Sequence, residues 1–184
     1  MSKTYERLDE KLIAFITAQK MFFVGTAPLS GNGSVNLSPK GYDSLAVIDD
    51  TTVAYVDLGG SGVETLAHVR ENGRITLMFC AFEGAANILR LYGEGEAVTV
   101  GEPGFAEKMA LFPAFDRARC VITVKITRIA DSCGWGVPFY EFKGEREQLK
   151  RWIDNRTEEE WLERRYASNE VSLDGLPGLT RPQG

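Results

Sequence analysis

The spacing of apolar residues changes from a helical to an extended period near Gln19. Before that point, Leu8, Leu12 and Ile16 recur at helical spacing, which predicts an amphipathic helix over Thr4–Gln19. After it, short runs rich in β-branched and aromatic residues alternate with turn residues. This change predicts a strand-rich protein that begins with a helix.

The extended runs are separated by turns and by two short helical segments. The predicted strands are Met21–Ala27, Ser34–Ser38, Leu45–Ile48, Thr52–Asp57, Ile75–Phe82, Asn87–Val100 and Cys120–Ile129. The Asn32-Gly33 step is a hairpin signal between the first two runs. Short helices are expected over Val63–Glu71 and Glu102–Leu111.

The C-terminal part of the chain has a helical pattern. One helix is predicted over Glu145–Asn155, and a capping box formed by Thr157 and Glu160 opens a second helix that runs through Ala167. The last dozen residues are rich in Gly and Pro, so a loose terminus is expected. Antiparallel hairpins with flanking helices favour an α+β barrel of about six strands over a Rossmann fold.

Length and charge restrict the class of protein further. A chain of 184 residues is expected to form a single domain over 1–184, with the barrel core at 20–131 and the C-terminal helices within 145–168. The net charge of -5, from 21 basic and 26 acidic residues, argues against nucleic-acid or anionic-membrane partners. A charged start and the lack of a long apolar run predict a cytoplasmic location without a membrane span.

The histidine and cysteine content limits the chemistry that the chain can perform. His68 is the only histidine, so neither a multi-histidine metal centre nor a triad built on another histidine is possible, and no metal is expected. His68 is expected to flank the apolar side of its helix in a structural or surface role. The three cysteines lack metal-ligand spacing, which indicates reduced thiols, and Cys133 has no neighbouring base.

The loop Gly59-Gly60-Ser61-Gly62 follows a predicted strand and precedes a helix. Glycine permits close approach to the backbone, and helix N-terminal amides attract anions, so this loop can hold a phosphate with help from Ser61 and Thr65. At least one of Gly60 and Gly62 is then expected to have a positive φ or to lie against the phosphate. The alternative is an ordinary strand-to-helix turn with Ser61 as its N-cap.

A second candidate is the segment Ser34–Gly41, in which Asn36 and Ser38 share one strand face. In a cavity, their amide and hydroxyl can bind the edge of a heterocycle, and Lys40, after Pro39, can reach an anion. The alternative is a solvated strand with a surface lysine.

Two further residues are candidates for contacts outside the core. Arg90 can pair with a phosphate or with an acid on a neighbouring strand. Trp135 lies between two glycines, as expected of an exposed indole at an interface or on a planar ligand. Alternatively, Trp135 plugs the end of the barrel or packs on the C-terminal helices.

The order of these motifs resembles that of a known family. The strand ending in NLSPKG, the stretch GGSGVETLAHVRENGRITLMF and the strand NILRLYGEG are similar to the FMN-binding split barrel of the pyridoxamine 5'-phosphate oxidase-like proteins. The resemblance extends over Met21–Ile129, and ETLAHVRENGRITLMF is its most specific part. It implies an α+β, antiparallel split β-barrel that binds FMN.

The resemblance implies a set of cofactor-binding residues. The segment Val35–Lys40 matches the strand that holds the isoalloxazine ring, and the loop Leu58–Thr65 matches the phosphate-binding stretch. The implied contacts are Val35, Asn36, Leu37, Ser38, Lys40, Leu58, Gly60, Ser61, Gly62, Thr65 and Asn87, the last at the position of a ring-contacting glutamine.

Two departures from the family pattern affect the expected chemistry. The oxidases carry an Arg-Lys pair where this chain has Glu64 and Thr65, so the phosphate is expected on Lys40, Ser61, Thr65 and loop amides. Their basic, tryptophan-containing C-terminal segment is not found in residues 141–184, so oxidation of pyridoxamine phosphate is not expected.

The resemblance implies a homodimer with the flavin at the subunit interface, and we expect Trp135 of one subunit to pack on the flavin of the other. The expected function is an FMN-dependent oxidoreductase with a small-molecule substrate or a nicotinamide electron donor. The flavin carries the hydride chemistry, so no catalytic side chain is assigned. The alternatives are a flavin-binding or sensing module without turnover, and a deazaflavin or haem on the same barrel; the single histidine disfavours haem.

Overall fold

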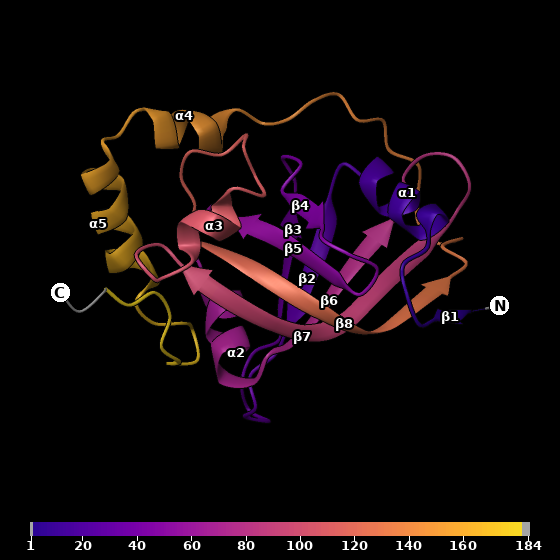
Figure 1. The fold of residues 1–184 in the computed structure, drawn as a ribbon, viewed down its shortest axis with the longest axis horizontal. Coiled ribbons are helices and arrows are strands. Elements are labelled where there is room, and N and C mark those ends of the chain that lie inside the picture. The colour runs from indigo at the N-terminus through magenta and orange to yellow at the C-terminus, as the bar shows by residue number, and fades with distance from the viewer. Residues whose placement is uncertain (1, 182–184) are drawn as a thin grey trace.

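The centre of the protein is one curled antiparallel sheet, seen in a computed structural model that describes residues 2–181 (Figure 1). Its strands are β1 (Thr4–Tyr5), β2 (Phe22–Thr26), β3 (Asn36–Lys40), β4 (Leu45–Val47), β5 (Thr52–Asp57), β6 (Arg74–Cys80), β7 (Ile88–Thr99) and β8 (Cys120–Ser132). The strand order is β3-β2-β6-β7-β8-β5-β4, and β1 pairs with β8. The predicted α+β split barrel is confirmed, with an eight-stranded sheet instead of about six strands.

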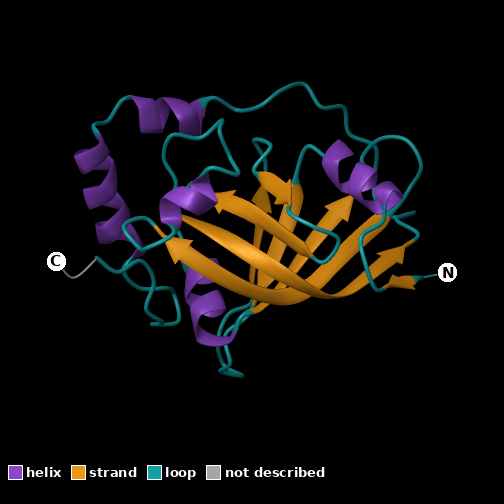
Figure 2. Cartoon of the chain, viewed as in Figure 1, coloured by secondary structure: helices purple, strands orange, loops and turns teal. Residues whose placement is uncertain are grey.

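Helices cover the ends and one side of this sheet (Figure 2). They are α1 (Glu10–Ala18), α2 (Glu64–Asn72), α3 (Phe105–Met109), α4 (Gln148–Asp154) and α5 (Glu158–Asn169). In Figure 1, α1 lies at one end of the molecule, and α4 and α5 lie at the other. The chain between β8 and α4 crosses from the first end to the second, which brings the C-terminal helices to the glycine loop between β5 and α2.

The long strands β7 and β8 form the middle of the core. Leu91 pairs with Ile129, and both side chains are fully buried. The register shifts between Tyr92 and Gly93, where a side chain at Gly93 would collide with the Lys125 carbonyl. Such a bulge increases the local twist, as a sheet that curls toward closure requires.

The N-terminal helix is shorter than the predicted Thr4–Gln19. The Asp9 side chain caps it by accepting a hydrogen bond from the Leu12 amide at 2.8 Å. Upstream of this cap, Thr4–Tyr5 forms β1, and the Tyr5 hydroxyl donates to Asp131 at 2.7 Å. The helical pattern failed here because an N-cap and an edge strand compete with helix formation.

The C-terminal segment is not loose as far as the structure describes it, so that prediction was wrong. Leu179 is 1% exposed within the main core, and its amide donates to the Asn169 carbonyl at 2.7 Å. The Arg70 guanidinium donates to the Gly178 carbonyl at 2.6 Å. The buried Leu179 side chain and the hydrogen bonds to the backbone therefore fix a segment whose Gly and Pro content is typical of a loop. Residues 182–184 lie outside the described residues.

Within residues 2–181, none of the described helices has the length and apolar character that crossing a bilayer requires. In the same part of the chain, no group of three or more His, Cys, Asp or Glu side chains is arranged to hold a metal ion.

Candidate functional site

Strand β3 lies at one edge of the sheet and divides its side chains between two faces. Asn36, Ser38 and Lys40 are half-buried on the face toward α2 and β5, whereas Val35 and Leu37 are 78% and 64% exposed. This is the period-two pattern predicted for Asn36 and Ser38. We use the name inner face for Asn36, Ser38 and Lys40.

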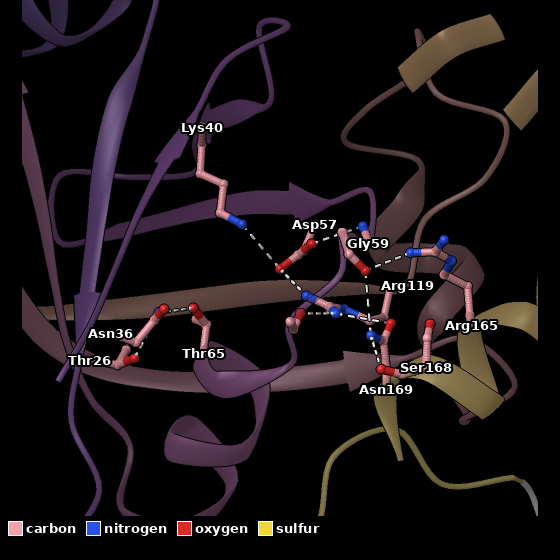
Figure 3. Close-up of polar contacts among 12 residues, drawn as sticks. Thr26, Asn36, Lys40, Asp57, Gly59, Thr65, Arg119, Arg165, Ser168 and Asn169 are labelled. Atoms are coloured by element: carbon pink, nitrogen blue, oxygen red, sulfur yellow. Dashed lines mark hydrogen bonds and ion pairs between the residues drawn. The ribbon is translucent and has the colours of Figure 1, made fainter. Parts of the chain in front are cut away.

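The inner face reaches the first turn of α2. The Asn36 side-chain amide donates to the Thr65 hydroxyl at 2.8 Å, so β3 and the start of α2 lie in direct contact (Figure 3). Behind this contact, the Thr26 hydroxyl lies 3.0 Å from Nδ1 of His68. His68 is fully buried, and burial lowers the pKa of its imidazole. Its role is therefore structural, on the buried side of α2.

A buried carboxylate joins the inner face to the glycine loop. Lys40 Nζ lies 3.3 Å from Asp57 Oδ2, and the Arg119 guanidinium donates to the same oxygen at 2.9 Å. The Gly59 amide donates to the other oxygen at 2.9 Å. Two positively charged side chains pair with a single carboxylate, so the Lys40–Asp57–Arg119 cluster keeps a net charge of +1.

The charges of this cluster control the protonation of Asp57. Burial alone raises the pKa of the carboxyl, but Arg119, Lys40 and the Gly59 amide outweigh it and hold the pKa well below its usual value. Asp57 is therefore ionised at neutral pH. Its charge orients Lys40 and leaves that ammonium only partly neutralised, as an anion site requires.

Buried polar atoms in and beside the cluster lack partners within the described residues. They include Arg119 Nε, Ser38 Oγ on the inner face and the Tyr55 hydroxyl on β5, whose ring lies 6.0 Å from Lys40 Nζ. Burial raises the pKa of Tyr55 well above its usual value, so the hydroxyl stays protonated. A buried polar atom without a partner costs about 1–3 kcal/mol, and a polar ligand on the inner face would remove that cost at Ser38.

The glycine loop (Gly59–Gly62) differs from its prediction in one respect. Gly59 has a φ of 77°, whereas neither Gly60 nor Gly62 has a positive φ. A Cβ on Gly59 would lie 3.0 Å from Cδ of Arg165. The backbone therefore requires glycine at Gly59, two residues after the end of β5. The positive φ expected as one alternative at Gly60 or Gly62 was wrong, and the other alternative, contact with a phosphate, stays a prediction.

The other loop residues predicted to contact the cofactor take different positions. Leu58 is buried in a small apolar cluster with Phe112 and Val121, so its side chain packs inside the protein. Ser61 is exposed, and Thr65 is buried beside Asn36. Of this stretch, Thr65 is the side chain in hydrogen-bond contact with the inner face.

Asn87 and Trp135 lie apart from the inner face. Asn87 precedes β7, and β2 and β6 separate that strand from β3, a span of about 14 Å across the sheet. Trp135 is 85% exposed beyond the end of β8, which excludes the alternative that it plugs the barrel or packs on the C-terminal helices. Arg90 donates to the Ser132 hydroxyl at 3.1 Å. Within one chain, these residues are not part of the Lys40 site.

Several residues that organise the site were missed in the sequence. They are Asp57, Arg119, Arg165 and Asn169, which surround the glycine loop from β5, β8 and α5 (Figure 3). Asp57 is a charged residue at the end of an apolar strand, and this position was the one weak sign in the sequence of a buried ion pair. The partners of Asp57 and the loop are far away in sequence, so nothing local indicates them.

The outer side of the sheet carries an open groove. Its volume is about 550 Å³, and Val35, Leu37, Gly25 and Tyr92 line part of it. Val35 and Leu37 expose apolar surface here that the described chain leaves uncovered. Contiguous apolar surface of this kind marks an interaction site.

Comparison with known proteins agrees with this architecture. The family model described as pyridoxamine 5'-phosphate oxidase matches residues 8–133. A relative from Aspergillus flavus, the pyridoxamine 5'-phosphate oxidase family protein ustO, is 38% identical over 193 residues, covering 95% of this chain and 77% of that protein.

Solved structures show the same fold at lower identity. The HupZ protein of Group A Streptococcus is 24% identical with a TM-score of 0.52, over 66% of this chain and 91% of that chain. A Lactobacillus delbrueckii protein ascribed to pyridoxamine 5'-phosphate oxidase is 15% identical with a TM-score of 0.51, over 68% and 94% of the two chains. From the family match and the fungal relative together, the chain belongs to the pyridoxamine 5'-phosphate oxidase family.

Proposed function

We propose that this protein binds FMN non-covalently at the inner face of β3 and acts as an oxidoreductase on a small molecule. The observation that carries the proposal is the Lys40–Asp57–Arg119 cluster, which keeps a net charge of +1 beside the buried, unpartnered Ser38 Oγ. A flavin phosphate supplies negative charge, and the ring edge supplies hydrogen-bond partners. Family membership supports the same cofactor class.

The residues present fit such a cofactor although the family's Arg-Lys pair is missing. Lys40 supplies the charge for the phosphate, and Thr65 supplies a hydroxyl at the first turn of α2, where helix amides also favour an anion. Asn36 and Ser38 supply an amide and a hydroxyl for the ring. Glu64, at the position of the family arginine, adds no positive charge, so the site depends on Lys40 more than an oxidase site does.

When bound, the flavin supplies the hydride-transfer chemistry, with a nicotinamide or the substrate as electron donor. The protein's own residues bind and orient it. Asp57 holds Lys40 in place, and buried apolar residues of β5 and β6 exclude water from the base of the site. No acid or base side chain is assigned, because Lys40 and Arg119 keep Asp57 ionised and burial keeps the Tyr55 hydroxyl protonated.

We further propose that the active form is a homodimer with the flavin shared between subunits. The exposed side chains Val35 and Leu37 line the outer groove, and a second exposed group, Trp135, Phe139 and Tyr140, follows β8. A partner subunit covers these surfaces in the proposal and brings Trp135 to the flavin of its neighbour. This arrangement would account for an indole that is 85% exposed in the single chain.

Absorbance spectroscopy tests the cofactor, and substitution of Lys40 tests the site. The purified protein should show a flavin spectrum, and chromatography of the released cofactor distinguishes FMN from FAD. The variant Lys40→Ala should bind FMN about 10- to 150-fold more weakly, since a charge-assisted hydrogen bond contributes roughly 1.5–3 kcal/mol. Equilibrium dialysis measures the affinity.

The matched control is Lys11→Ala, which removes an exposed lysine on α1. It should leave FMN affinity unchanged. Equal FMN affinity in Lys40→Ala and the parent would reject the proposed site. A haem or deazaflavin spectrum would reject the proposed cofactor.

A further inference from the structure

A cleft lies on the other side of the glycine loop, where the C-terminal helices approach it. Its volume is about 540 Å³, and its wall includes Gly60, Ser61, Trp152, Arg164 and Arg165. Lys40 does not line this cleft; it approaches Asp57 from the opposite side to Arg165 (Figure 3). The cleft and the inner face are therefore two separate places on the loop.

Two arginines, Arg164 and Arg165, line this cleft, and no acidic side chain of the described residues lines it. Arg156 lies next to it and lines a neighbouring pocket together with three glutamates of α5. The Arg165 and Arg156 guanidinium carbons lie 4.4 and 4.0 Å from the centre of the Trp152 ring, so the indole holds both cations in place. Within residues 2–181, none of Arg156, Arg164 and Arg165 forms an ion pair. Arginine cannot lose its charge at neutral pH, so this positive charge persists.

Arg165 is the most deeply buried of these three arginines. The residue is 8% exposed, its Nη1 donates to the Gly60 carbonyl at 2.7 Å, and its Nε is buried without a partner among the described residues. Burial lowers the pKa of its guanidinium, and the charges of Arg119, Arg156 and Arg164 lower it further. An anion that forms well-aligned hydrogen bonds to this cation would compensate its unpaired charge.

The glycine loop offers one backbone hydrogen-bond donor to the same cleft. Arg165 binds the carbonyl of Gly60, and because the carbonyl and the N–H of a trans peptide point in opposite directions, the Ser61 N–H points away from Arg165. Gly60 lines the cleft, and its own amide belongs to the preceding peptide and donates to no protein acceptor in the described chain. A free amide beside guanidinium groups is a donor for phosphate and carboxylate oxygens.

From these observations we infer that the cleft binds the phosphate or carboxylate group of a small organic anion, at a site separate from Lys40. Arg164, Arg165 and the amide of Gly60 contact the anionic group, and Leu149 supplies an apolar surface for the rest of the molecule. The inference does not depend on flavin binding. Such an anion is either a free substrate or the adenylate phosphate of a flavin dinucleotide.

Isothermal titration of the purified full-length chain with phenyl phosphate tests the inference. The variant Arg165→Gln should weaken binding at least about tenfold, and Arg164→Gln, which changes an exposed residue, about threefold. The matched control Arg151→Gln removes an exposed arginine of α4 that pairs with Glu147, and it should leave binding unchanged. Unfolding of each variant by urea confirms that it is folded.

Two outcomes would contradict the inference. Parent-like affinity for phenyl phosphate in both Arg164→Gln and Arg165→Gln overturns it. So does loss of binding in Lys40→Ala, because that result would place the anion on the inner face.

Two further titrations distinguish the sources of the anion. Benzoate in place of phenyl phosphate shows whether a carboxylate is accepted. FAD and FMN affinities of the parent and of Arg164→Gln are then compared. If the parent prefers FAD and Arg164→Gln loses that preference, the anion is the second phosphate of a dinucleotide. If the preference is the same in both proteins, the cleft binds a free substrate. Failure of phenyl phosphate to bind the parent at millimolar concentration would reject the cleft while leaving the proposed FMN site intact.

Discussion

The substitution Asp57→Asn isolates the contribution of the buried charge cluster. The Asp57 and Arg119 side chains are each 3% exposed, and asparagine can still accept the hydrogen bond from the Gly59 amide. The substitution therefore removes the negative charge and leaves the Arg119 guanidinium buried without it. Removing one partner of such a pair costs about 3–5 kcal/mol of the 5–15 kcal/mol that stabilise an ordinary domain.

The effect should depend on pH in a definite direction. Because the cluster lowers the pKa of Asp57 in the folded protein, its stabilisation is complete above the carboxyl's unfolded pKa, about 4. It is lost as the pH falls below that value toward the folded pKa. The difference between parent and Asp57→Asn should therefore be largest near neutral pH and should narrow progressively below pH 4.

Urea unfolding followed by circular dichroism at pH 7 and at pH 3 measures both effects. Asp116→Asn changes an exposed acid and serves as the control, with an expected change below about 0.5 kcal/mol. The double variant Asp57→Asn/Arg119→Met should recover part of the stability, because it removes both charges. A loss below about 1 kcal/mol in Asp57→Asn, or strict additivity in the double variant, would refute the role assigned to the pair.

Three other substitutions have expected outcomes. Gly59→Ala should destabilise the protein by about 1–2 kcal/mol in urea unfolding, because Gly59 has a φ of 77° and an added Cβ would crowd Arg165. Gly60→Ala, with open space around it, should cost less than about 1 kcal/mol. Equal losses of stability in the two variants would contradict the special role of Gly59. Leu179→Ala should lower the unfolding free energy by about 2–5 kcal/mol, and no change would mean that the tail does not pack on the core. Trp135→Ala should weaken both FMN binding and self-association in analytical ultracentrifugation, and a flavin-loaded parent monomer would refute the shared site.

The fold was largely predictable because its signals are local. Period-two alternation predicted most strands within a few residues, and the capping box of Thr157 and Glu160 opens α5 as expected. The shared face of Asn36 and Ser38 also followed from alternation alone. The resemblance added the family, which no single local pattern could have given.

The surroundings of the candidate site were not predictable, because they depend on pairing between distant segments. Asp57 meets Arg119 across the β5–β8 pairing, and Arg165 reaches the loop only because α5 packs there. The sequence predicted the helix that carries Arg165 but not what this helix packs against. Likewise, a single leucine fixes a tail whose Gly and Pro content predicts a loop, since composition does not report whether one side chain is buried.

Arg119 and Arg165 bring to the glycine loop the positive charge that the family's Arg-Lys pair would supply. Where the family places two basic residues at the start of the helix, this chain has Glu64 and Thr65, so α2 itself brings no positive charge to its first turn. Positive charge reaches the glycine loop instead from Arg119, which immediately precedes β8, and from Arg165 on α5, and both bind its carbonyl groups.

This change has a consequence for the chemistry of the loop. A guanidinium bound to a loop carbonyl fixes the orientation of that peptide, and the adjoining amide N–H then points the other way. Because Arg165 of α5 holds the Gly60 carbonyl, the Ser61 N–H faces away from α5. The C-terminal helices therefore do more than cover one end of the sheet: they determine which side of the loop this donor faces.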